Sequence, residues 1–420
     1  MDIKVSSFIP NGKIDIPSSK SYAHRALIAA FIANKGSYIK DINLCDDIKC
    51  TLNALKSLGA NFSLNNNDVE FFNNDNPPEE VIIDVGSSGS TLRFLLPLAS
   101  YLCKHVTFVG SEQLFSRPLS PYLDILSKQN IPFILKSSSL EILSSIKEDD
   151  FIINEDISSQ FISGWLFLLA KANKSHFIKT SMQLGSKNYV SMTIDVLSKF
   201  GVKLVIKDNL IIHSFSHFNY LTYTIEKDYS QMAFFATLGA LKGNVTFSNM
   251  NISSLQGDKQ IIDILIDGGA KTDFLGENIT FFHSLIKGQE IDISNCIDLG
   301  PILFVLGACS FGQTKLINTK RLTYKESNRL FAMKEELEKC GVKIDVFDNE
   351  VIIQGNASYQ GDYHFSSHND HRICMALAIF SVINHGTCTI SNYECVNKSY
   401  PNFFNDLFSL NKEALWTIKQ

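Results

Sequence analysis

Apolar and polar positions along the chain follow two different periods, and each period predicts one kind of element. Near the N-terminus, two sets of apolar residues at a spacing of four predict one buried face of a helix. These residues are Tyr22, Ala26 and Ala30, together with Ala23, Leu27 and Phe31. Alternating segments at 60–72, 202–212 and 342–353, each with Asn or Asp near its centre, instead predict β-hairpins.

A helix-ending signature recurs along the chain: a Leu, three further residues, and then Gly or Asn. The six copies are Leu55–Gly59, Leu126–Asn130, Leu197–Gly201, Leu265–Gly269, Leu337–Gly341 and Leu407–Asn411. Gly and Asn are the residues that take the left-handed conformation closing a helix. Their spacings are 71, 71, 68, 72 and 70 residues, so six repeats of about 70 residues account for the 420-residue chain.

Each repeat is predicted to have the order β-α-β-α-β-β, because a strand and apolar helical stretches precede the signature and a hairpin follows it. Three repeats can surround one core, which divides a chain of 420 residues into two similar α/β domains. No Pro- or Ser-rich linker marks the boundary, so its position near 223–228 depends on the repeat spacing alone.

The composition excludes several classes of protein. A hydrophobic fraction of 45% and a charged fraction of 19% are typical of folded domains. A net charge of −5 without a basic block argues against binding to nucleic acid or membrane surfaces. The apolar runs 161–170 and 301–308 are shorter than the roughly 20 residues of a membrane span. Residues 1–13 contain no signal-peptide core, and nine cysteines without C-x-x-C pairs fit reduced thiols, so we expect a cytoplasmic protein.

Of the 38 basic residues only six are arginine, the side chain suited to forked recognition of carboxylates and phosphates. Five of the six lie at predicted helix starts, namely Arg25, Arg93, Arg117, Arg329 and Arg372. Helix N-termini also attract anions, through free N–H groups and the helix dipole. We therefore predict an anion-binding site in a cleft between the two domains that closes on its ligands.

Single motifs remain open to ordinary structural interpretations. Residues 18–21 (Ser-Ser-Lys-Ser) form either a phosphate-binding helix start or a simple N-cap, and residues 325–329 form either a ligand site or a solvated charged face. The spacing of His364, His368 and His371 could suit zinc, but no Cys or carboxylate pattern completes such a site.

The polar motifs are Lys20-Ser21-x3-Arg25, Gly86-Ser-Ser-Gly89 with Arg93, Arg117-Pro118, Ser158-Ser159-Gln160, Ser186-Lys-x-Tyr189, Asp298, Lys325-Glu326-x2-Arg329, Asn369-Asp-His-Arg372 and Lys398. In this order and spacing they resemble the motifs of the enolpyruvyl transferases, most closely those of the members that act on shikimate 3-phosphate. Each motif is common by itself, whereas the whole set is specific, and the resemblance covers the whole chain.

The resemblance implies an inside-out α/β barrel of two domains, residues 1–18 with 227–420 and residues 19–226, with the active site between them. It implies transfer of the enolpyruvyl group of phosphoenolpyruvate to the 5-hydroxyl of shikimate 3-phosphate, in the shikimate pathway of aromatic amino-acid biosynthesis. Phosphate would leave from a tetrahedral intermediate. No metal or organic cofactor, no nucleic acid and no membrane is implied, and a monomer is the default expectation.

The resemblance also assigns roles to individual residues. The catalytic residues would be Lys20, Asp298 as base for the 5-hydroxyl, and Glu326 as the acid that protonates the methylene carbon. Phosphoenolpyruvate would be bound by Lys20, Gly89, Arg117, Gln160, Arg329, His371, Arg372 and Lys398. Shikimate 3-phosphate would be bound by Lys20, Ser21, Arg25, Ser158, Ser159, Gln160, Ser186, Tyr189, Asp298, Arg321 and Lys325.

At a few positions the chain departs from the commonest family pattern. Ser87 and Ser90 replace Asn and Thr, Asn188 replaces Pro, and Arg321 stands where Asn is frequent. These changes put substrate affinity and the response to the inhibitor glyphosate in doubt, but not the reaction.

Other classes fit the sequence less well. Related transferases that use UDP-N-acetylglucosamine carry a Cys in the loop before the Arg-Pro pair and an Asn after the N-terminal Lys, whereas here residues 110–116 contain no Cys and Ser21 follows Lys20. An RNA 3′-phosphate cyclase would need a nucleotidylated His and a nucleic-acid surface. A sliding clamp would need excess Lys and Arg along its helices. A non-catalytic phosphometabolite-binding protein stays open, because only activity excludes it.

Overall fold

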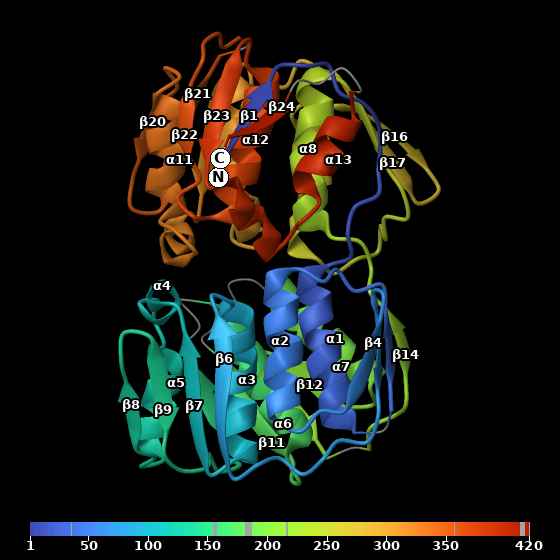
Figure 1. Ribbon diagram of the computed structural model, residues 1–420, viewed down its shortest axis with the longest axis vertical. Helices are drawn as coiled ribbons and strands as arrows, with labels where there is room; N and C mark the ends of the chain where they lie inside the picture. The colour runs from blue at the N-terminus through green and yellow to red at the C-terminus, as the bar shows by residue number, and fades with distance from the viewer. Residues whose placement is uncertain are drawn as a thin grey trace. The chain divides into compact units, whose positions relative to one another are not determined.

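The computed structural model describes residues 1–34, 36–153, 158–180, 187–215, 217–356, 358–411 and 416–419. The chain forms two compact units (Figure 1). The discontinuous unit consists of Met1–Pro17 and Lys227–Gln420, and the continuous unit consists of Ser18–Glu226. Ser186, one of the expected site residues, lies outside the described part of the chain.

Six four-stranded sheets, three in each unit, share one strand order. In every sheet two neighbouring strands are parallel, and the two remaining strands continue the sheet in antiparallel pairing. The predicted β-α-β-α-β-β repeat is therefore confirmed, and with it the α/β fold class.

The sheets of the continuous unit are β14 (Thr222–Thr224), β3 (Tyr38–Lys40), β5 (Asp68–Phe71) and β4 (Phe62–Asn65); β6 (Glu80–Gly86), β7 (His105–Gly110), β9 (Ser139–Ile142) and β8 (Phe133–Leu135); and β10 (Phe151–Ile153), β11 (His176–Thr180), β13 (Leu210–Ser214) and β12 (Lys203–Lys207). Those of the discontinuous unit are β2 (Asn11–Ile14), β15 (Asn244–Phe247), β17 (Asn278–Phe282) and β16 (Lys271–Leu275); β18 (Glu290–Asp292), β19 (Gly312–Ile317), β21 (Glu350–Gly355) and β20 (Lys343–Val346); and β22 (His364–Ser366), β23 (Thr387–Ser391), β1 (Asp2–Ser6) and β24 (Trp416–Lys419).

Strands from distant parts of the chain complete three of these sheets. In the continuous unit, β14 lies parallel to β3, although most of that unit separates them in sequence. In the discontinuous unit, β2 pairs with β15 and β1 pairs with β23 and β24. The first 17 residues therefore belong to the sheets of the discontinuous unit, whose remaining strands all follow residue 227.

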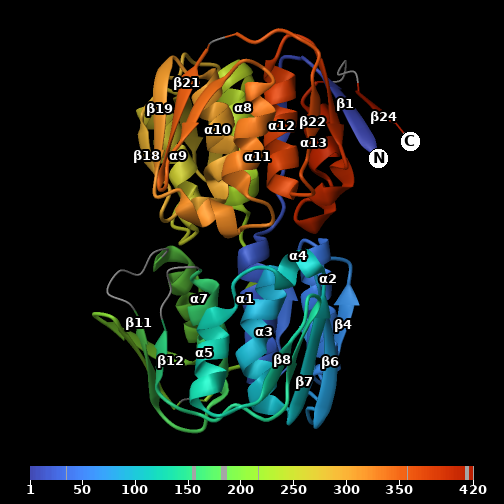
Figure 2. The same ribbon diagram turned by 90° about the vertical axis from the view of Figure 1, so that its left-hand side faces the viewer.

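The core of each unit contains three central helices that pack against one another. They are α1 (Lys20–Ala33), α3 (Gly89–Leu102) and α6 (Gln160–Lys171) in the continuous unit, and α8 (Tyr229–Lys242), α10 (Gly300–Cys309) and α12 (His371–Ile383) in the discontinuous unit (Figure 2). The spacing of apolar residues predicts one buried face for α1, but every residue from Tyr22 to Ala33 is buried. No face of α1 is left for solvent, because it lies inside a ring of other elements.

A second helix follows in each repeat. These helices are α2 (Asp46–Ser57), α5 (Ser120–Lys128), α7 (Lys187–Lys199), α9 (Ile261–Asp267), α11 (Arg329–Glu338) and α13 (Phe403–Ser409). Shorter elements are α4 (Glu112–Phe115), η1 (Gly257–Gln260), η2 (Ile297–Leu299), η3 (Lys320–Tyr324) and η4 (Tyr393–Lys398). None of the helices in the described ranges is long and apolar enough to cross a membrane.

The helix-ending signature has the predicted backbone conformation in five of its six copies. Gly59, Asn130, Gly201, Gly269 and Gly341 all have positive φ angles, between 56° and 100°. Asn411 is not among the described residues with positive φ, and its side-chain amide donates to the Ile9 carbonyl instead. The prediction was wrong there because the N-terminal segment contacts the end of the last repeat, whereas no such segment meets the other five.

Candidate active site

The central helices of the two units begin with different kinds of residue. In the continuous unit, the Ser19 and Ser88 hydroxyls cap α1 and α3. In the discontinuous unit, the carboxylates of Asp228 and Asp370 cap α8 and α12, and Asp298 lies in η2 directly before α10. One unit therefore presents hydroxyl groups at its helix starts and the other presents carboxylates, next to the expected anion-binding residues.

Asp298 is the centre of an ion-pair network in the discontinuous unit. Its Oδ1 lies 2.9 Å from Lys325 Nζ and 3.2 Å from Arg329 Nη1, and its Oδ2 lies 3.2 Å from Arg372 Nη2. Lys325 follows η3, Arg329 begins α11, and Arg372 is the second residue of α12. Four of the expected site residues are thus brought together by four different elements.

Arg329 binds three carboxylates at once. Besides Asp298, it donates from Nη2 to Glu326 Oε2 at 2.6 Å, and from Nε to Asp370 Oδ2 at 2.8 Å. A planar guanidinium can serve several acceptors in this way because its N–H groups form a rigid fork. Glu326 and Asp298, the expected acid and base, are therefore held by one side chain.

Two buried carboxyl groups near this network differ in acidity. Burial alone would raise the pKa of Asp298, but the charges of Arg372, Lys325 and Arg329 outweigh burial and hold its pKa well below the usual range. Asp258, in η1, accepts a hydrogen bond from the Ser230 hydroxyl and is only 2% exposed. Burial and the charge of Asp298 raise the pKa of Asp258 to about 7. One carboxyl is therefore ionised at neutral pH, while the other is poised to hold a proton.

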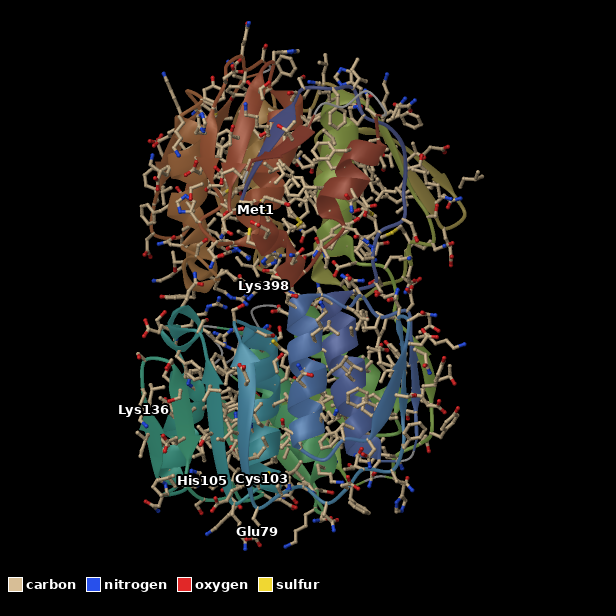
Figure 3. The ribbon with its side chains drawn as sticks, viewed as in Figure 1. Met1, Glu79, Cys103, His105, Lys136 and Lys398 are labelled. Carbon is tan, nitrogen blue, oxygen red and sulfur yellow. The ribbon has the colours of Figure 1, made fainter. Side chains whose placement is uncertain are left out.

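The remaining expected residues of this unit lie at the same helix starts or in neighbouring short elements. His371, the first residue of α12, is buried with its Nδ1 3.8 Å from Asp370 Oδ1. Arg321, in η3, donates to the Ser294 carbonyl at 3.3 Å. Lys398 is the last residue of η4 and is labelled in Figure 3.

The three histidines with zinc-like spacing do not form a common site in the part of the chain that the structure describes. The single group there that could hold a metal ion is Glu335, Glu336 and His368. Glu336 is fully buried and already binds His368, Lys339 and the Ser366 N–H. His368 therefore pins the loop before α12 to α11 and is not part of a histidine cluster.

In the continuous unit, Lys20 is the first residue of α1, and its Nζ lies 2.8 Å from Asp47 Oδ2 on α2. Both side chains are largely buried, at 12% and 5% exposure. An ion pair with so little solvent fixes the position of the ammonium group more firmly than a surface pair does. Asp47 is thus a partner of the expected catalytic lysine.

Arg25 lies one turn further along α1 and holds two other expected residues in place. It donates from Nη1 to the Ser21 carbonyl at 2.7 Å, from Nη2 to the Tyr189 carbonyl at 3.0 Å, and from Nε to Thr193 Oγ1 at 2.8 Å. Burial lowers the pKa of Arg25 to about 10, and none of these acceptors is a carboxylate. A buried cation of this kind is an electrostatic attraction for an anionic ligand.

Gly89, at the start of α3, lies between two guanidinium groups. A Cβ at this position would be 3.1 Å from Arg93 Nη1 and 3.2 Å from Arg117 Nη1. Arg93 Nη1 also donates to Gln160 Oε1 at 2.9 Å, and Gln160 Nε2 donates to Ser90 Oγ at 3.0 Å. Two cations, an amide and a helix N-terminus therefore converge on a position with no side chain, which is an anion-binding arrangement.

The serines before α6 are also near this position. Ser158 Oγ accepts from the Gln160 N–H at 3.3 Å, and Ser159 is the buried N-cap residue. Their hydroxyls thus lie beside the amide that contacts Arg93.

Sequence analysis missed several residues of these networks. Asp47, Asp258 and Ser230 carry no motif of their own, and Asp370 stands inside a motif without an assigned role. One signal was present for Asp47, since two acidic residues at a helix start commonly interact with nearby cations. For Asp258 and Ser230 no sequence signal exists, because their pairing depends on two segments that are 28 residues apart.

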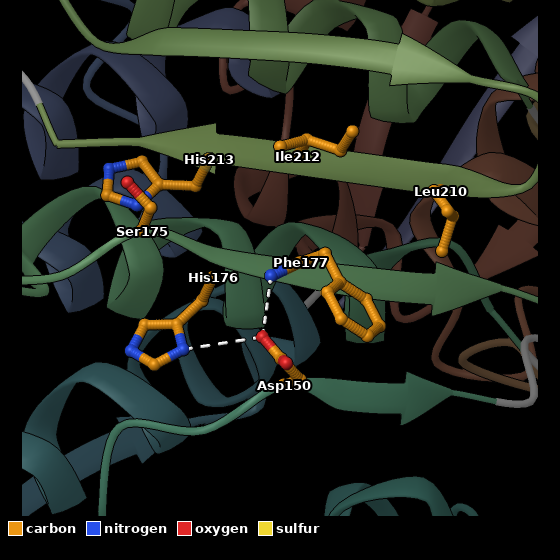
Figure 4. Close-up of a pocket in the computed structure, with 7 residues that line it drawn as sticks. All are labelled: Asp150, Ser175, His176, Phe177, Leu210, Ile212 and His213. Carbon is orange, nitrogen blue, oxygen red and sulfur yellow. Dashed lines mark hydrogen bonds and ion pairs between the residues drawn. The ribbon is translucent and has the colours of Figure 1, made fainter.

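The described pocket in Figure 4 does not coincide with these helix starts. It has a volume of about 230 Å³ and is lined by Asp150, Ser175, His176, Phe177, Leu210, Ile212 and His213. His176 Nδ1 lies 3.4 Å from Asp150 Oδ1. None of the expected site residues lines this pocket.

The fold and these helix starts are those of the enolpyruvyl transferase class. An enolpyruvyl transferase, NikO from Streptomyces tendae, superposes with a TM-score of 0.77 over 99% of this chain and 98% of its own, at 14% identity. EPSP synthase from Acinetobacter baumannii superposes with a TM-score of 0.81 over 99% of this chain and 100% of its own, at 22% identity.

Within that class, the chain belongs to the family of EPSP synthase (3-phosphoshikimate 1-carboxyvinyltransferase), whose family model matches residues 10–407. The 3-phosphoshikimate 1-carboxyvinyltransferase of Clostridium novyi is 40% identical over 96% of both chains. That of Clostridium kluyveri is 38% identical over 97% of both chains. The predicted family and its transferase activity are thereby confirmed.

Proposed function

We propose that this chain transfers the enolpyruvyl group of phosphoenolpyruvate to the 5-hydroxyl of shikimate 3-phosphate and releases phosphate. The observation that carries the proposal is the network in which Asp298, Glu326 and Arg329 lie within hydrogen-bond distance. It combines a candidate base, a candidate acid and the cations that anionic substrates require.

Phosphoenolpyruvate carries a phosphate and a carboxylate, so its site needs several cations. We assign to it Gly89, Arg117, Gln160 and Lys20 from the continuous unit and Arg329, His371, Arg372 and Lys398 from the discontinuous unit. The convergence of the Arg93 and Arg117 guanidinium groups beside Gly89 supports this assignment. A side chain at position 89 would occupy the space into which both guanidinium groups point.

We assign shikimate 3-phosphate to the residues around Arg25. The bonds from Arg25 to the carbonyls of Ser21 and Tyr189 place both residues beside a buried positive charge. Lys20, Ser158, Ser159, Gln160, Ser186, Asp298, Arg321 and Lys325 complete the proposed set. Because these residues belong to both units, we propose that the substrates bind in a cleft between them.

Asp298 cannot act as a strong base while three cations hold its pKa low. Lys325, Arg329 and Arg372 are, however, the same groups that we assign to the substrate anions. When they turn toward phosphate and carboxylate groups, their hold on Asp298 weakens and its proton affinity rises. Substrate binding would thus activate the base that takes the proton of the 5-hydroxyl, which then attacks C2 of the enol.

Glu326 would protonate the methylene carbon in the addition step and remove a proton in the elimination step, when phosphate leaves. Its bond to Arg329 Nη2 at 2.6 Å favours the carboxylate in the ligand-free protein. The same transfer of Arg329 to a substrate anion would allow Glu326 to take up the proton that an acid must carry. Lys20 would share this proton work.

The test is phosphate release by the purified protein with shikimate 3-phosphate and phosphoenolpyruvate, omitting each in turn and repeating with UDP-N-acetylglucosamine. Release only with the first pair supports the proposal. Release with the UDP-sugar alone would contradict it, and binding without release would indicate a non-catalytic phosphometabolite-binding protein.

Two variants test the assigned roles. Asp298→Asn and Glu326→Gln should each lower kcat by a factor of about 100 or more, as is typical for loss of a general acid or base. Glu338→Gln, on the exposed side of α11 where Glu338 pairs with Lys334, is the matched control and should keep full activity. Full turnover by Glu326→Gln would remove Glu326 from the mechanism.

We also propose that the protein acts as a cytoplasmic monomer without a nucleic-acid partner. The net charge of −5 and the absence of a basic block support this part of the proposal. Light scattering of the purified protein, which should give a mass near 47 kDa, tests the monomer.

A further inference from the structure

We propose that Asp258 is a positioning residue of the reaction site, which carries a proton and thereby leaves Arg372 to Asp298 and to the incoming substrate anion. This inference rests on the proposed function. It adds a residue that no motif contains and a condition for activity, namely that the second buried carboxyl group stays neutral.

Asp258 lies where three elements of the discontinuous unit meet. Its short helix η1 contacts α8 and η2, and Asp258 accepts the hydrogen bond of Ser230 on the first turn of α8. Gln256, just before η1, holds the same turn by accepting from the Tyr229 N–H at 3.0 Å and donating to the Lys227 carbonyl at 2.7 Å. The segment is thus fixed to the helix start by side chains on both sides of Gly257.

The charged and titratable groups that act on Asp258 come from each of these elements. Asp298 and Asp228 disfavour its ionisation, from η2 and the start of α8. Arg372 from α12 and the Ser230 hydroxyl favour ionisation. Cys296, directly before η2, feels the Asp258 charge in turn, which contributes with burial to a raised thiol pKa. Two acids and burial on one side therefore oppose one cation and one hydroxyl on the other.

The balance has a consequence for Arg372. A neutral Asp258 makes no claim on that guanidinium group, whose Nη2 lies 3.2 Å from Asp298 Oδ2. An ionised Asp258 would attract the guanidinium and repel a substrate carboxylate or phosphate. If this coupling amounts to one pKa unit, substrate affinity changes about tenfold, because one unit corresponds to a factor of ten.

The experiment compares the pH profiles of kcat/KM for phosphoenolpyruvate from pH 6.5 to pH 9. In the wild-type enzyme we expect a fall of about tenfold as Asp258 ionises above pH 7. Asp258→Asn, which imitates the protonated carboxyl, should keep the wild-type value at pH 6.5 and lose the fall. Asp258→Ala, which leaves the Ser230 hydroxyl without its acceptor, should be impaired at every pH.

Ser230→Ala is the second variant. The Ser230 hydroxyl stabilises the ionised carboxyl, so its removal should shift the fall toward higher pH. The proposal is overturned if Asp258→Asn shows the same fall as the wild-type enzyme, or if Ser230→Ala leaves the profile where it was. If one variant does not fold, the other still decides.

Thermal unfolding separates this inference from the proposed function. Because the pKa of Asp258 is raised by folding, its contribution to stability is fully present below the unfolded pKa and is lost as pH rises toward 7. Asp258→Asn should therefore become stabilising relative to wild type between about pH 5 and pH 8, whatever the enzyme catalyses. An inactive wild-type protein would contradict the proposed function alone, whereas an unchanged pH dependence of stability in Asp258→Asn would contradict the proton on Asp258.

Discussion

Arg329 and Asp370 are joined by two hydrogen bonds, from Nε to Oδ2 at 2.8 Å and from Nη2 to Oδ1 at 3.2 Å. The two side chains are 1% and 0% exposed. Asp370 also caps α12 by accepting from the Arg372 N–H at 2.9 Å. This pair therefore fixes the start of α11 to the start of α12, and with it the position of Arg372.

Replacement of Arg329 by Lys tests this fork. A single ammonium group cannot reproduce two parallel bonds, so Asp370 would keep its charge in a buried place with an incomplete partner. We expect Arg329→Lys to lower the free energy of unfolding by about 3 kcal/mol, measured by urea denaturation. Arg321→Lys, which loses only a bond to the Ser294 carbonyl, should change it by less than about 1 kcal/mol. Equal losses in both variants would contradict the structural role of the fork.

Asp47 and Asp46 form a matched pair for testing the position of Lys20. Asp47 is buried and binds Lys20, whereas its neighbour Asp46 is exposed and lies 3.6 Å from Lys49. Asp47→Asn should lower kcat/KM at least tenfold, because Lys20 loses the charge that fixes it near the reacting groups. Asp46→Asn should stay within about twofold of wild type in the same steady-state assay. Similar values for the two variants would mean that Asp47 does not position Lys20.

Gly89→Ala tests the arrangement of guanidinium groups at the start of α3. The added methyl group would lie 3.1 Å from Arg93 Nη1 and 3.2 Å from Arg117 Nη1, so both groups must shift by a few tenths of an ångström. We expect KM for phosphoenolpyruvate to rise about tenfold, which corresponds to about 1.4 kcal/mol. KM for shikimate 3-phosphate serves as the internal control and should change little. A rise in both constants would argue against the division of the site proposed above.

His368 and Glu336 predict a pH dependence of stability. Hydrogen bonding to Glu336 raises the pKa of His368, so its stabilising effect is full below the unfolded pKa of about 6.5 and is lost as pH rises through the folded value. Burial would raise the pKa of Glu336, but His368 and Lys339 lower it, so the carboxylate persists through mildly acidic pH. We expect His368→Gln to cost about 1 kcal/mol near pH 5.5 and less at pH 8.

The control for this prediction is His364→Gln, an exposed residue on β22 four positions earlier. Its thermal unfolding should follow the wild-type protein at both pH values. A loss of stability in His368→Gln that is the same at pH 5.5 and pH 8 would mean that the ion pair is not its cause.

The sequence by itself determined the repeat and the family. The spacing of Gly59, Gly201, Gly269 and Gly341 revealed six units, because only a few residue types can take the left-handed conformation that ends a helix. The order of motifs from Lys20 to Lys398 identified the family, because the residues that touch an anionic substrate must keep their chemical type. Both are local properties of the chain, so they can be read without knowing what lies nearby in space.

Only the tertiary structure decided which charges meet. Lys20 and Asp47 are 27 residues apart, Arg25 reaches Thr193 over 168 residues, and Arg372 reaches Asp298 over 74. Asp258 and Asp298 have the same side chain, yet one has a pKa raised to about 7 and the other a pKa well below its usual range. The difference arises from burial and from the cations that folding brings to Asp298, because electrostatic interactions depend on distance in space and not on separation along the chain.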